Sequence, residues 1–372
     1  MAPFNSFDYE VMSELLARSR DMLGLTFPNP VTASAIVKNK KIISIGVHQG
    51  PGEDHAEVVA LKKAGNEAHG ADLYVNLEPC SHKGKTPPCT QAIINSGIKR
   101  VVYAIEDPNP KVRQHPAKDI LNEQGILVET GLMEKEAFEL NEVFLKTILT
   151  GLPFVTLKIG LSLDGKIAAL PYQKTQITSE ESLKYVHKLR REVDAIIVGI
   201  DTIIADDPLL TVRFGYLTKG FRPPLRVVLD SNGRLPLDSK ILKDDLVENT
   251  IVFVSELISQ EKYDTLSSKV TTIKVKLSKK GLEWVEILRV LYDLGCYSIL
   301  VEGGQRITTS IVQSGFVDKL MLFVAPKTIG EDGLSFFIDS QLELFGDDYS
   351  LEDMKVLSVG QDALVQGYLT KD

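Results

Sequence analysis

This chain of 372 residues has little cysteine, no excess of basic charge and no long apolar run. Its three cysteines are too few for a disulfide framework at this length, and they indicate a reducing compartment. The net charge of −8 argues against an extended nucleic-acid surface, which would need a basic face. No apolar stretch reaches the roughly 18 residues that span a bilayer. We therefore expect a cytoplasmic protein that binds neither nucleic acid nor membrane.

Other signals are absent as well. The first ten residues carry no basic side chain, so no signal or transit peptide is expected. There is no internal repeat and no low-complexity tract, and no G-x-G-x-x-G follows a strand pattern, which argues against a standard Rossmann half. What is present, 44% hydrophobic and 25% charged residues over this length, suits two globular domains. The oligomeric state is left open, and a homo-oligomer is compatible with the sequence.

The first half of the chain alternates helical and strand patterns, which predicts a sheet between layers of helices. Gly151-Leu152-Pro153 interrupts the pattern, and we place a domain boundary there, giving domains 1–150 and 151–372. The second half repeats the alternation and contains one polar insertion, 238–249, expected to be a surface loop. The expected helices are 7–23, 134–147, 180–192, 282–294, 307–313 and those after His55 and Pro88; the expected strands are 34–47 (two, around a turn at 38–41), 73–77, 101–105, 154–159, 195–199, 226–230, 251–254 and 298–302.

The most informative segment holds His55, Glu57, Cys80 and Cys89. Tetrahedral zinc takes nitrogen and sulfur ligands, and a catalytic site uses three of them and leaves the fourth position for water. In the H-x-E…P-C-x-x-C signature of zinc deaminases the glutamate moves protons and is not a ligand. Here eight residues, rather than two, separate the cysteines. A chance pattern, with two buried cysteines and a histidine at a helix start, is the alternative.

The context favours the zinc site. Both 52–61 and 87–94 are typical of a loop that opens a helix, the second with prolines at the helix start. Each would present a ligand near a helix N-terminus, where the partial positive charge favours a thiolate. The single remaining cysteine, Cys296, lies in an apolar run and is expected to be part of the core.

Several longer motifs resemble the bifunctional riboflavin-biosynthesis deaminase/reductase family, over nearly the whole chain. The resemblance implies an α/β protein in which a cytidine-deaminase-like three-layer domain, 1–150, precedes a dihydrofolate-reductase-like α/β domain, 151–372. It implies two cofactors, Zn²⁺ and NADPH, and a phosphorylated pyrimidine as the small-molecule substrate. The motifs are Glu78 to Cys89, Pro28-Asn29-Pro30, Asp107-Pro108-Asn109-Pro110, Lys158 to Lys166, Asp201 to Arg213 and Glu302-Gly303-Gly304.

The resemblance also assigns residues. In the deaminase, zinc would be held by His55, Cys80 and Cys89, with Glu57 as the proton carrier. Substrate would be held there by Asn29, His48, His82, Lys85 and Thr86. In the reductase, Lys158 is the catalytic candidate. Substrate would be held there by Arg190, Leu209, Arg213 and Glu302. NADPH would be bound by Gly160, Thr202, Asp206, Ser231, Gly304, Gln305 and Arg306.

For two groups of reductase residues, the arginines and the glycines, physical chemistry also supports binding of phosphate. Arg190 and Arg213 suit a dianionic phosphate, because guanidinium offers permanently charged, bidentate donors. Glycines where a strand meets a helix, as in Gly303-Gly304, allow backbone N–H groups to approach a phosphate. The alternatives are an arginine paired with a carboxylate and an ordinary tight turn.

The chain departs from the family pattern at Thr32-Ala33-Ser34, at Arg113 to Pro116 and at Gln176, which stands where a tryptophan is usual. Two other functions stay open. One is a nucleotide or nucleic-acid deaminase with a non-catalytic second domain, although the acidic charge and the long zinc loop argue against it. The other is a scaffold with structural zinc, which would need a fourth ligand. Only Glu57 or His82 could supply that ligand.

Overall fold

The computed structural model describes residues 4–82, 87–173, 175–217, 221–338 and 349–371. These residues form two compact units, Met1–Gly151 and Leu152–Asp372. The helix that closes the first unit ends at Gly151, whose left-handed backbone (φ 65°) suits a residue without a Cβ. Within the described residues, no helix is both long and apolar enough to cross a lipid bilayer.

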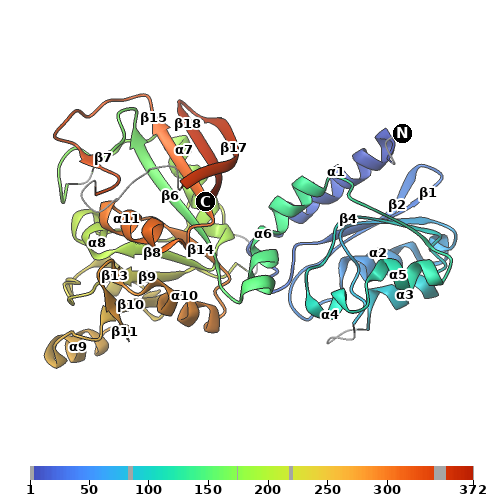
Figure 1. The fold of residues 1–372 in the computed structure, drawn as a ribbon, viewed down its shortest axis with the longest axis horizontal. Helices are drawn as coiled ribbons and strands as arrows, with labels where there is room; N and C mark the ends of the chain where they lie inside the picture. The colour runs from blue at the N-terminus through green and yellow to red at the C-terminus, as the bar shows by residue number, and fades with distance from the viewer. Residues whose placement is uncertain (1–3, 83–86, 174, 218–220, 339–348, 372) are drawn as a thin grey trace. The chain divides into compact units, whose positions relative to one another are not determined.

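In the first unit, helices cover both faces of a sheet with the order β2-β1-β3-β4-β5 (Figure 1). β1 runs antiparallel to its neighbours β2 and β3, whereas β3, β4 and β5 are parallel. The strands are β1 (Ala33–Lys38), β2 (Lys41–Val47), β3 (Asp72–Leu77), β4 (Arg100–Ile105) and β5 (Leu127–Thr130). The helices are α1 (Ser6–Arg20), α2 (Ala56–Ala64), α3 (Cys89–Asn95), α4 (Pro110–Arg113), α5 (Ala117–Glu123), α6 (Glu134–Thr150) and the 3₁₀ turn η1 (Gly65–Ala68).

The alternation of side chains along β1 explains this layering. Ala33, Ala35 and Val37 point to the face covered by α1 and α6, and Ile36 points to the face covered by α2, α3 and α5. Because both faces are covered, strand residues are buried almost throughout β3 and β4. The result is a three-layer α/β/α domain whose parallel strands end at one edge.

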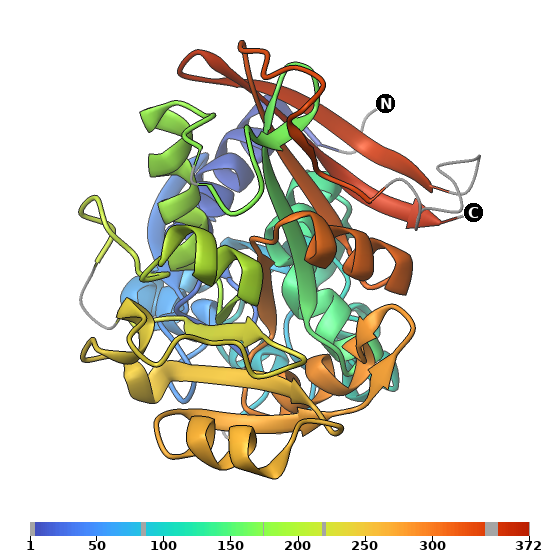
Figure 2. The same ribbon diagram turned by 90° about the vertical axis from the view of Figure 1, so that its left-hand side faces the viewer.

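The second unit contains a sheet with the order β11-β10-β9-β8-β14-β6-β15-β18-β17, parallel as far as β15 and antiparallel in β17 and β18. The red strands β17 and β18 lie at the end of the sheet opposite α9 (Figure 2). The strands are β6 (Phe154–Ser162), β7 (Lys166–Ala168), β8 (Ala195–Gly199), β9 (Leu225–Leu229), β10 (Thr250–Ser255), β11 (Thr271–Val275), β12 (Leu277–Ser278), β13 (Gly281–Leu282), β14 (Ser298–Val301), β15 (Lys319–Ala325), β16 (Leu334–Ser335), β17 (Tyr349–Val359) and β18 (Asp362–Lys371).

The helices of this unit again cover both faces. Trp284, Leu288 and Ile311 place α10 and α11 on one face, and Ile203 and Val186 place α8 and α7 on the other. The helices are α7 (Glu180–Glu192), α8 (Ile200–Asp206), α9 (Gln260–Ser267), α10 (Trp284–Asp293) and α11 (Gln305–Ser314), with 3₁₀ turns η2 (Lys240–Leu242) and η3 (Val247–Asn249). The carboxyl ends of β8, β9 and β14 therefore meet at one edge, where open α/β sheets bind their ligands.

The polar insertion 238–249 is more than the surface loop that its composition suggests. It contains the two 3₁₀ turns, and Ile241 is fully buried. Asp244 forms a bidentate pair with Arg226, whose side chain is 1% exposed, at 2.5 and 2.8 Å. A buried guanidinium needs such a partner. The segment is thus packed against the sheet, and its Asp244 supplies the negative charge that pairs with Arg226 of β9.

Candidate active sites

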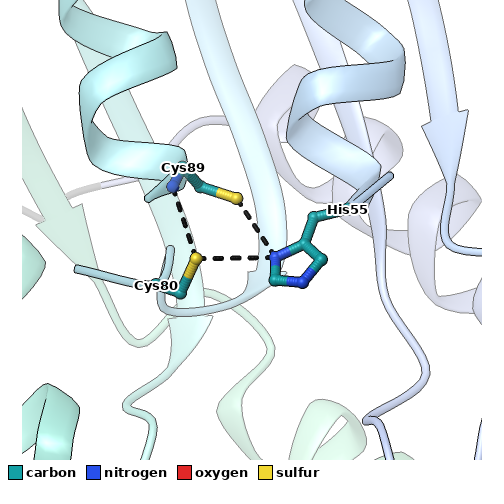
Figure 3. A group of neighbouring side chains, drawn as sticks. All are labelled: His55, Cys80 and Cys89. Atoms are coloured by element: carbon teal, nitrogen blue, oxygen red, sulfur yellow. Dashed lines mark hydrogen bonds between the residues drawn. The ribbon is translucent and has the colours of Figure 1, made fainter. Parts of the chain in front are cut away.

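Three side chains that are distant in the sequence meet in the first unit. His55 immediately precedes α2, Cys80 follows β3, and Cys89 is the first residue of α3. Their side chains point toward one another (Figure 3), and the potential ligand atoms all lie within 4.8 Å. The His55 Nδ1 atom is 3.5 Å from the Cys80 sulfur and 3.2 Å from the Cys89 sulfur.

The chemistry and spacing of this cluster fit zinc. Zn–S bonds of about 2.3 Å and Zn–N bonds of about 2.0–2.1 Å separate tetrahedral ligand atoms by about 3.6 Å. A hydrogen bond from the Cys89 thiol, and one from His55, lower the pKa of Cys80 to about 4 although burial opposes this. Both thiols are free of disulfides. Within the described residues the cluster has three members, which leaves the fourth tetrahedral position that a catalytic site requires.

Glu57 lies in the first turn of α2, two residues beyond His55, and is 4% exposed. Burial raises the pKa of its carboxyl above the usual value, and the nearby Cys80 thiolate adds to that effect. The carboxyl also interacts with the Cys89 thiol, which places it beside the cluster. A carboxyl with a raised pKa next to a metal site suits proton transfer near neutral pH.

Asn29 and His48, both predicted to hold substrate, contact each other next to this cluster. The His48 Nδ1–H donates to the Asp54 carbonyl (3.1 Å), so its Nε2 accepts from the Asn29 amide at 2.9 Å. Burial lowers the pKa of His48 and keeps the ring neutral. The ring packs edge-on against His55, with 5.6 Å between centroids. The pair therefore forms one wall beside the potential metal ligand.

The loop between the two cysteines is only partly described. The Nδ1 atom of His82 is buried and has no hydrogen-bond partner among the residues that the structure describes. Lys85 and Thr86 lie outside the described residues. A further residue, Glu78, was not singled out from the sequence. Its buried carboxylate accepts from the backbone N–H groups of 107 and 117 and pairs with Arg113. The signal was a charged residue directly after the buried strand β3.

The second unit holds a cavity of about 1350 Å³ at the carboxyl ends of β8, β9 and β14. Ligand pockets commonly measure about 300–1,000 Å³, so this one has room for more than a single small molecule. Every reductase residue predicted from the sequence lines it: Lys158, Arg190, Leu209, Arg213, Glu302, Gly160, Thr202, Asp206, Ser231, Gly304, Gln305 and Arg306. Basic side chains outnumber acidic ones in its lining, eight to five, although the whole chain is acidic. The excess favours anionic ligands.

A buried ion cluster centres on Glu302. Its carboxylate receives two hydrogen bonds from Arg190, at 2.6 and 3.0 Å, and lies 3.6 Å from the ammonium of Lys158. Burial alone would raise the pKa of Glu302, but the Arg190 and Lys158 charges lower it to about 2. The third nitrogen of Arg190 donates to the carbonyl of Thr211 (3.2 Å). These contacts use three of the five N–H donors of the Arg190 guanidinium, and its role at a ligand phosphate stays a prediction.

Arg213 differs from Arg190 in its surroundings. The residue is exposed, lines the cavity, and forms no ion pair with any residue that the structure describes. Its backbone N–H donates to Nδ1 of His187 at 3.0 Å, and its guanidinium lies 3.3 Å from Nε2 of the same ring. An unpaired arginine at a cavity is available to an anion.

The glycines at the end of β14 permit a close approach of α11. A Cβ on Gly303 or on Gly199 would lie 2.6 Å from a side-chain atom of Ile307, too close for any other residue. The first turn of α11 therefore sits directly on the ends of β8 and β14. Beside it, Asp201 pairs with Arg234 (2.7 Å) and with Arg306 (3.7 Å), so two basic side chains are held at the cavity by one carboxylate. Three residues at this cavity or behind it were not predicted as site residues: Asp201, Arg234 and His187.

Comparison with known proteins agrees with both sites. Residues 6–105 match the cytidine and deoxycytidylate deaminase zinc-binding region, and residues 153–365 match the RibD C-terminal domain. The riboflavin biosynthesis protein RibD of Aquifex aeolicus is 41% identical over 96% of this chain and 97% of its own.

The chain belongs to the RibD family. A solved structure of RibD from Acinetobacter baumannii superposes with a TM-score of 0.83 and 34% identity over 98% of this chain and 99% of that one. A diaminohydroxyphosphoribosylaminopyrimidine deaminase/5-amino-6-(5-phosphoribosylamino)uracil reductase from Thermotoga maritima gives a TM-score of 0.81 and 31% identity over the same shares.

As a RibD protein, the chain is a bifunctional deaminase and reductase of riboflavin biosynthesis. The predicted fold class, the two activities, and zinc and NADPH as cofactors are confirmed. The alternative of a non-catalytic second domain is contradicted by the match of residues 153–365 to the RibD reductase domain. The open fourth position of the His55–Cys80–Cys89 cluster speaks against the alternative of a closed structural zinc site.

Proposed function

We propose that this protein carries out two consecutive steps on one phosphorylated pyrimidine. The first removes the C2 amino group of 2,5-diamino-6-ribosylamino-4(3H)-pyrimidinone 5′-phosphate. The second reduces the ribosyl group to ribityl, which gives 5-amino-6-ribitylamino-uracil 5′-phosphate. The observation that carries the proposal is that one chain combines a three-ligand cluster beside a buried glutamate with a separate cationic cavity. We assign deamination to residues 1–150 and reduction to residues 151–372.

In the deaminase, His55, Cys80 and Cys89 hold zinc. When bound, zinc supplies a water whose pKa is lowered to about 7. Glu57 accepts the proton of the attacking water on its carboxylate and returns it to the departing amino nitrogen, so that ammonia leaves and C2 gains an oxygen. Its raised pKa suits both transfers.

The substrate of the deaminase meets Asn29, His48 and the loop between the cysteines. The Asn29 amide N–H already donates to the His48 ring, and we propose that the amide oxygen accepts from the ligand. The Nδ1 atom of His82 has no partner among the described residues, which supports a role for that side chain, and we assign Lys85 and Thr86 to the phosphate end of this site.

In the reductase, NADPH supplies hydride to the ribosyl carbon that is reduced. Lys158 gives polar assistance at that carbon, and Glu302 holds its ammonium in place at 3.6 Å. Arg213 binds the substrate phosphate, and Arg190 and Glu302, which pair with each other, face the substrate in the same cavity. Leu209 lines the substrate portion of the cavity. The cofactor portion is formed by Gly160, Thr202, Asp206, Ser231, Gly304, Gln305 and Arg306.

The cellular setting follows from the metal ligands. Cys80 and Cys89 must stay reduced to bind zinc, and both are free of disulfides, which supports a cytoplasmic location. The acidic composition supports a small-molecule substrate rather than nucleic acid. A homo-oligomer stays a prediction.

The assignment of Arg213 has a direct test. Arg213→Ala should raise KM for the amino-uracil phosphate about 10- to 200-fold, since a charge-assisted contact contributes about 1.5–3 kcal/mol. KM for NADPH and the rate of deamination should not change. The measurement is steady-state NADPH oxidation with each ligand varied in turn. A raised KM for NADPH at an unchanged KM for the pyrimidine would move Arg213 to the cofactor site and contradict the assignment.

A further inference from the structure

The segment that carries Leu209 and Arg213 is fixed at alternate residues by buried side chains. Three different side chains, two from α7 and one from β9, each bind a backbone group of this segment. These contacts are Arg226 to the Leu209 carbonyl (3.1 Å), Arg190 to the Thr211 carbonyl (3.2 Å) and the Arg213 N–H to His187 (3.0 Å). The contact with His187 is made by Arg213, the residue that we propose binds the substrate phosphate.

His187 is fully buried on α7, one turn before Arg190 on the same face of the helix. Because its Nδ1 atom accepts the backbone N–H of Arg213, the neutral ring carries its proton on Nε2. Burial and the Arg190 and Arg213 charges lower the pKa of His187 to about 4, which keeps it neutral. Nε2–H and the Arg213 guanidinium, 3.3 Å apart, are then both donors, and an anionic oxygen near the guanidinium would relieve that mismatch.

The residue after Arg213 completes this arrangement. Phe214 has a left-handed backbone, with φ of 61°, which a residue with a side chain adopts only where its surroundings enforce it. Its ring packs edge-on against the His187 imidazole, with 5.0 Å between centroids. His187 thus contacts the chain on both sides of the Arg213 side chain. Gly215 follows, also with positive φ, and turns the chain away.

We propose that His187 is a positioning residue of the reductase, which fixes the backbone of Arg213 so that the guanidinium meets the substrate phosphate. The inference rests on the proposed phosphate contact of Arg213. His187 itself lies outside the lining of the cavity, so it acts through Arg213 and not on the substrate.

Two substitutions separate this role from mere packing. In His187→Asn, the amide oxygen takes the place of Nδ1 and keeps an acceptor for the Arg213 N–H, whereas His187→Gln places its amide near Nε2 and loses that acceptor. We expect KM for the amino-uracil phosphate to rise about 3- to 10-fold in the Gln variant, as for loss of one hydrogen bond, and less than 3-fold in the Asn variant. KM for NADPH should stay constant. Lys188→Ala, an exposed neighbour on α7, is the matched control.

The same assay with the dephosphorylated pyrimidine shows whether the effect acts through phosphate. Its KM should be equal in wild type and His187→Gln. An effect of equal size on both substrates, or recovery by Gln and not by Asn, would overturn the proposal. Deamination provides a check on the integrity of the chain, because its site lies in the other unit.

A double-mutant cycle distinguishes failure of this inference from failure of the phosphate assignment. If Arg213→Ala leaves KM for the phosphorylated pyrimidine unchanged, the assignment of Arg213 is wrong. If Arg213→Ala raises KM but His187→Gln does not, the inference about His187 is wrong. We expect both to raise it, with no further increase when His187→Gln is added to Arg213→Ala.

A measurement on the wild-type enzyme covers the case in which the variants fold poorly. Besides the ring of His55, whose Nδ1 faces the metal position, the ¹⁵N NMR spectrum of the histidine rings should contain one neutral ring with its proton on Nε2 that stays unprotonated down to about pH 5. Its Nε2 signal should shift when inorganic phosphate is added. A proton on Nδ1 of that ring, or no response to phosphate, would overturn the proposal.

Discussion

Replacing Glu57 by glutamine separates proton transfer from every other contribution to the deaminase. Glutamine has nearly the same shape, and the side chain is 4% exposed in the first turn of α2, so the substitution opens no cavity. Glu57 forms no ion pair with a lysine or arginine among the described residues, so removing its charge leaves no lysine or arginine there without a partner. The buried carboxylate is itself costly, and we expect the variant to be at least as stable as wild type.

The expected loss is therefore chemical. A positioned general acid–base contributes about 10²–10⁴-fold, or about 2.7–5.5 kcal/mol of barrier, and we expect a decrease in ammonia release within that range. Zinc content by mass spectrometry and the melting temperature should equal those of wild type. Reduction of supplied amino-uracil phosphate should persist, because that site lies in the other unit. Glu67→Gln, at an exposed residue of η1, is the control for glutamate replacement. Ammonia release within 3-fold of wild type, at full zinc occupancy, would refute the role of Glu57.

Three other changes test other parts of the account. Cys80→Ser or Cys89→Ser should lower zinc occupancy and deamination together, because hydroxyl is a harder, less acidic ligand than thiolate; metal analysis that finds full zinc in both would place the ligands elsewhere. Glu302→Gln should destabilise the second unit by about 3–5 kcal/mol in urea unfolding, because it leaves the buried Arg190 without its counter-charge; an unchanged midpoint would contradict this. Division of the chain after Gly151 should yield two separately folded fragments, each with its own core, as judged by circular dichroism; two insoluble fragments would indicate a shared interface.

Local patterns made the regular elements predictable. The helix expected at 180–192 has those bounds in the structure, because Ser179 caps it, Glu180 and Glu181 occupy its first turn, and apolar residues recur at helical spacing. Buried strands such as β8 and β10 are short continuous apolar runs, and such runs can be recognised as strands in the sequence. The zinc cluster was predictable because its residue types are rare in this chain and their order is distinctive.

Other elements were missed, including β15, although its sequence is a continuous apolar run after Lys319. β17 is a strand at the edge of the sheet whose residues are largely exposed, so its sequence carries little hydrophobic alternation. The short helices α4 and α5 lack the length that makes helical periodicity visible. In these segments the tertiary contacts decide the structure, and a single sequence does not display them.

The same limit applies to the sites. Arg190 and Glu302 are 112 residues apart in the sequence, and only the fold shows that they pair. His187 was missed because nothing near it in the sequence indicates that its ring contacts Arg213, 26 residues further on. Residue type and motif identified which side chains surround each site, whereas the partner of each charge depended on long-range packing.

The central claim is that two complete sites on one chain act in succession on one substrate. The most direct test incubates the purified protein with the diamino-pyrimidine phosphate, with and without NADPH, and identifies the products by mass. Without NADPH, we predict a single product in which one amino group is replaced by oxygen, with release of ammonia. With NADPH, that product should gain two hydrogens, and one NADPH should be oxidised for each molecule formed. Oxidation of NADPH without prior release of ammonia, or no deamination by zinc-loaded protein, would contradict the account.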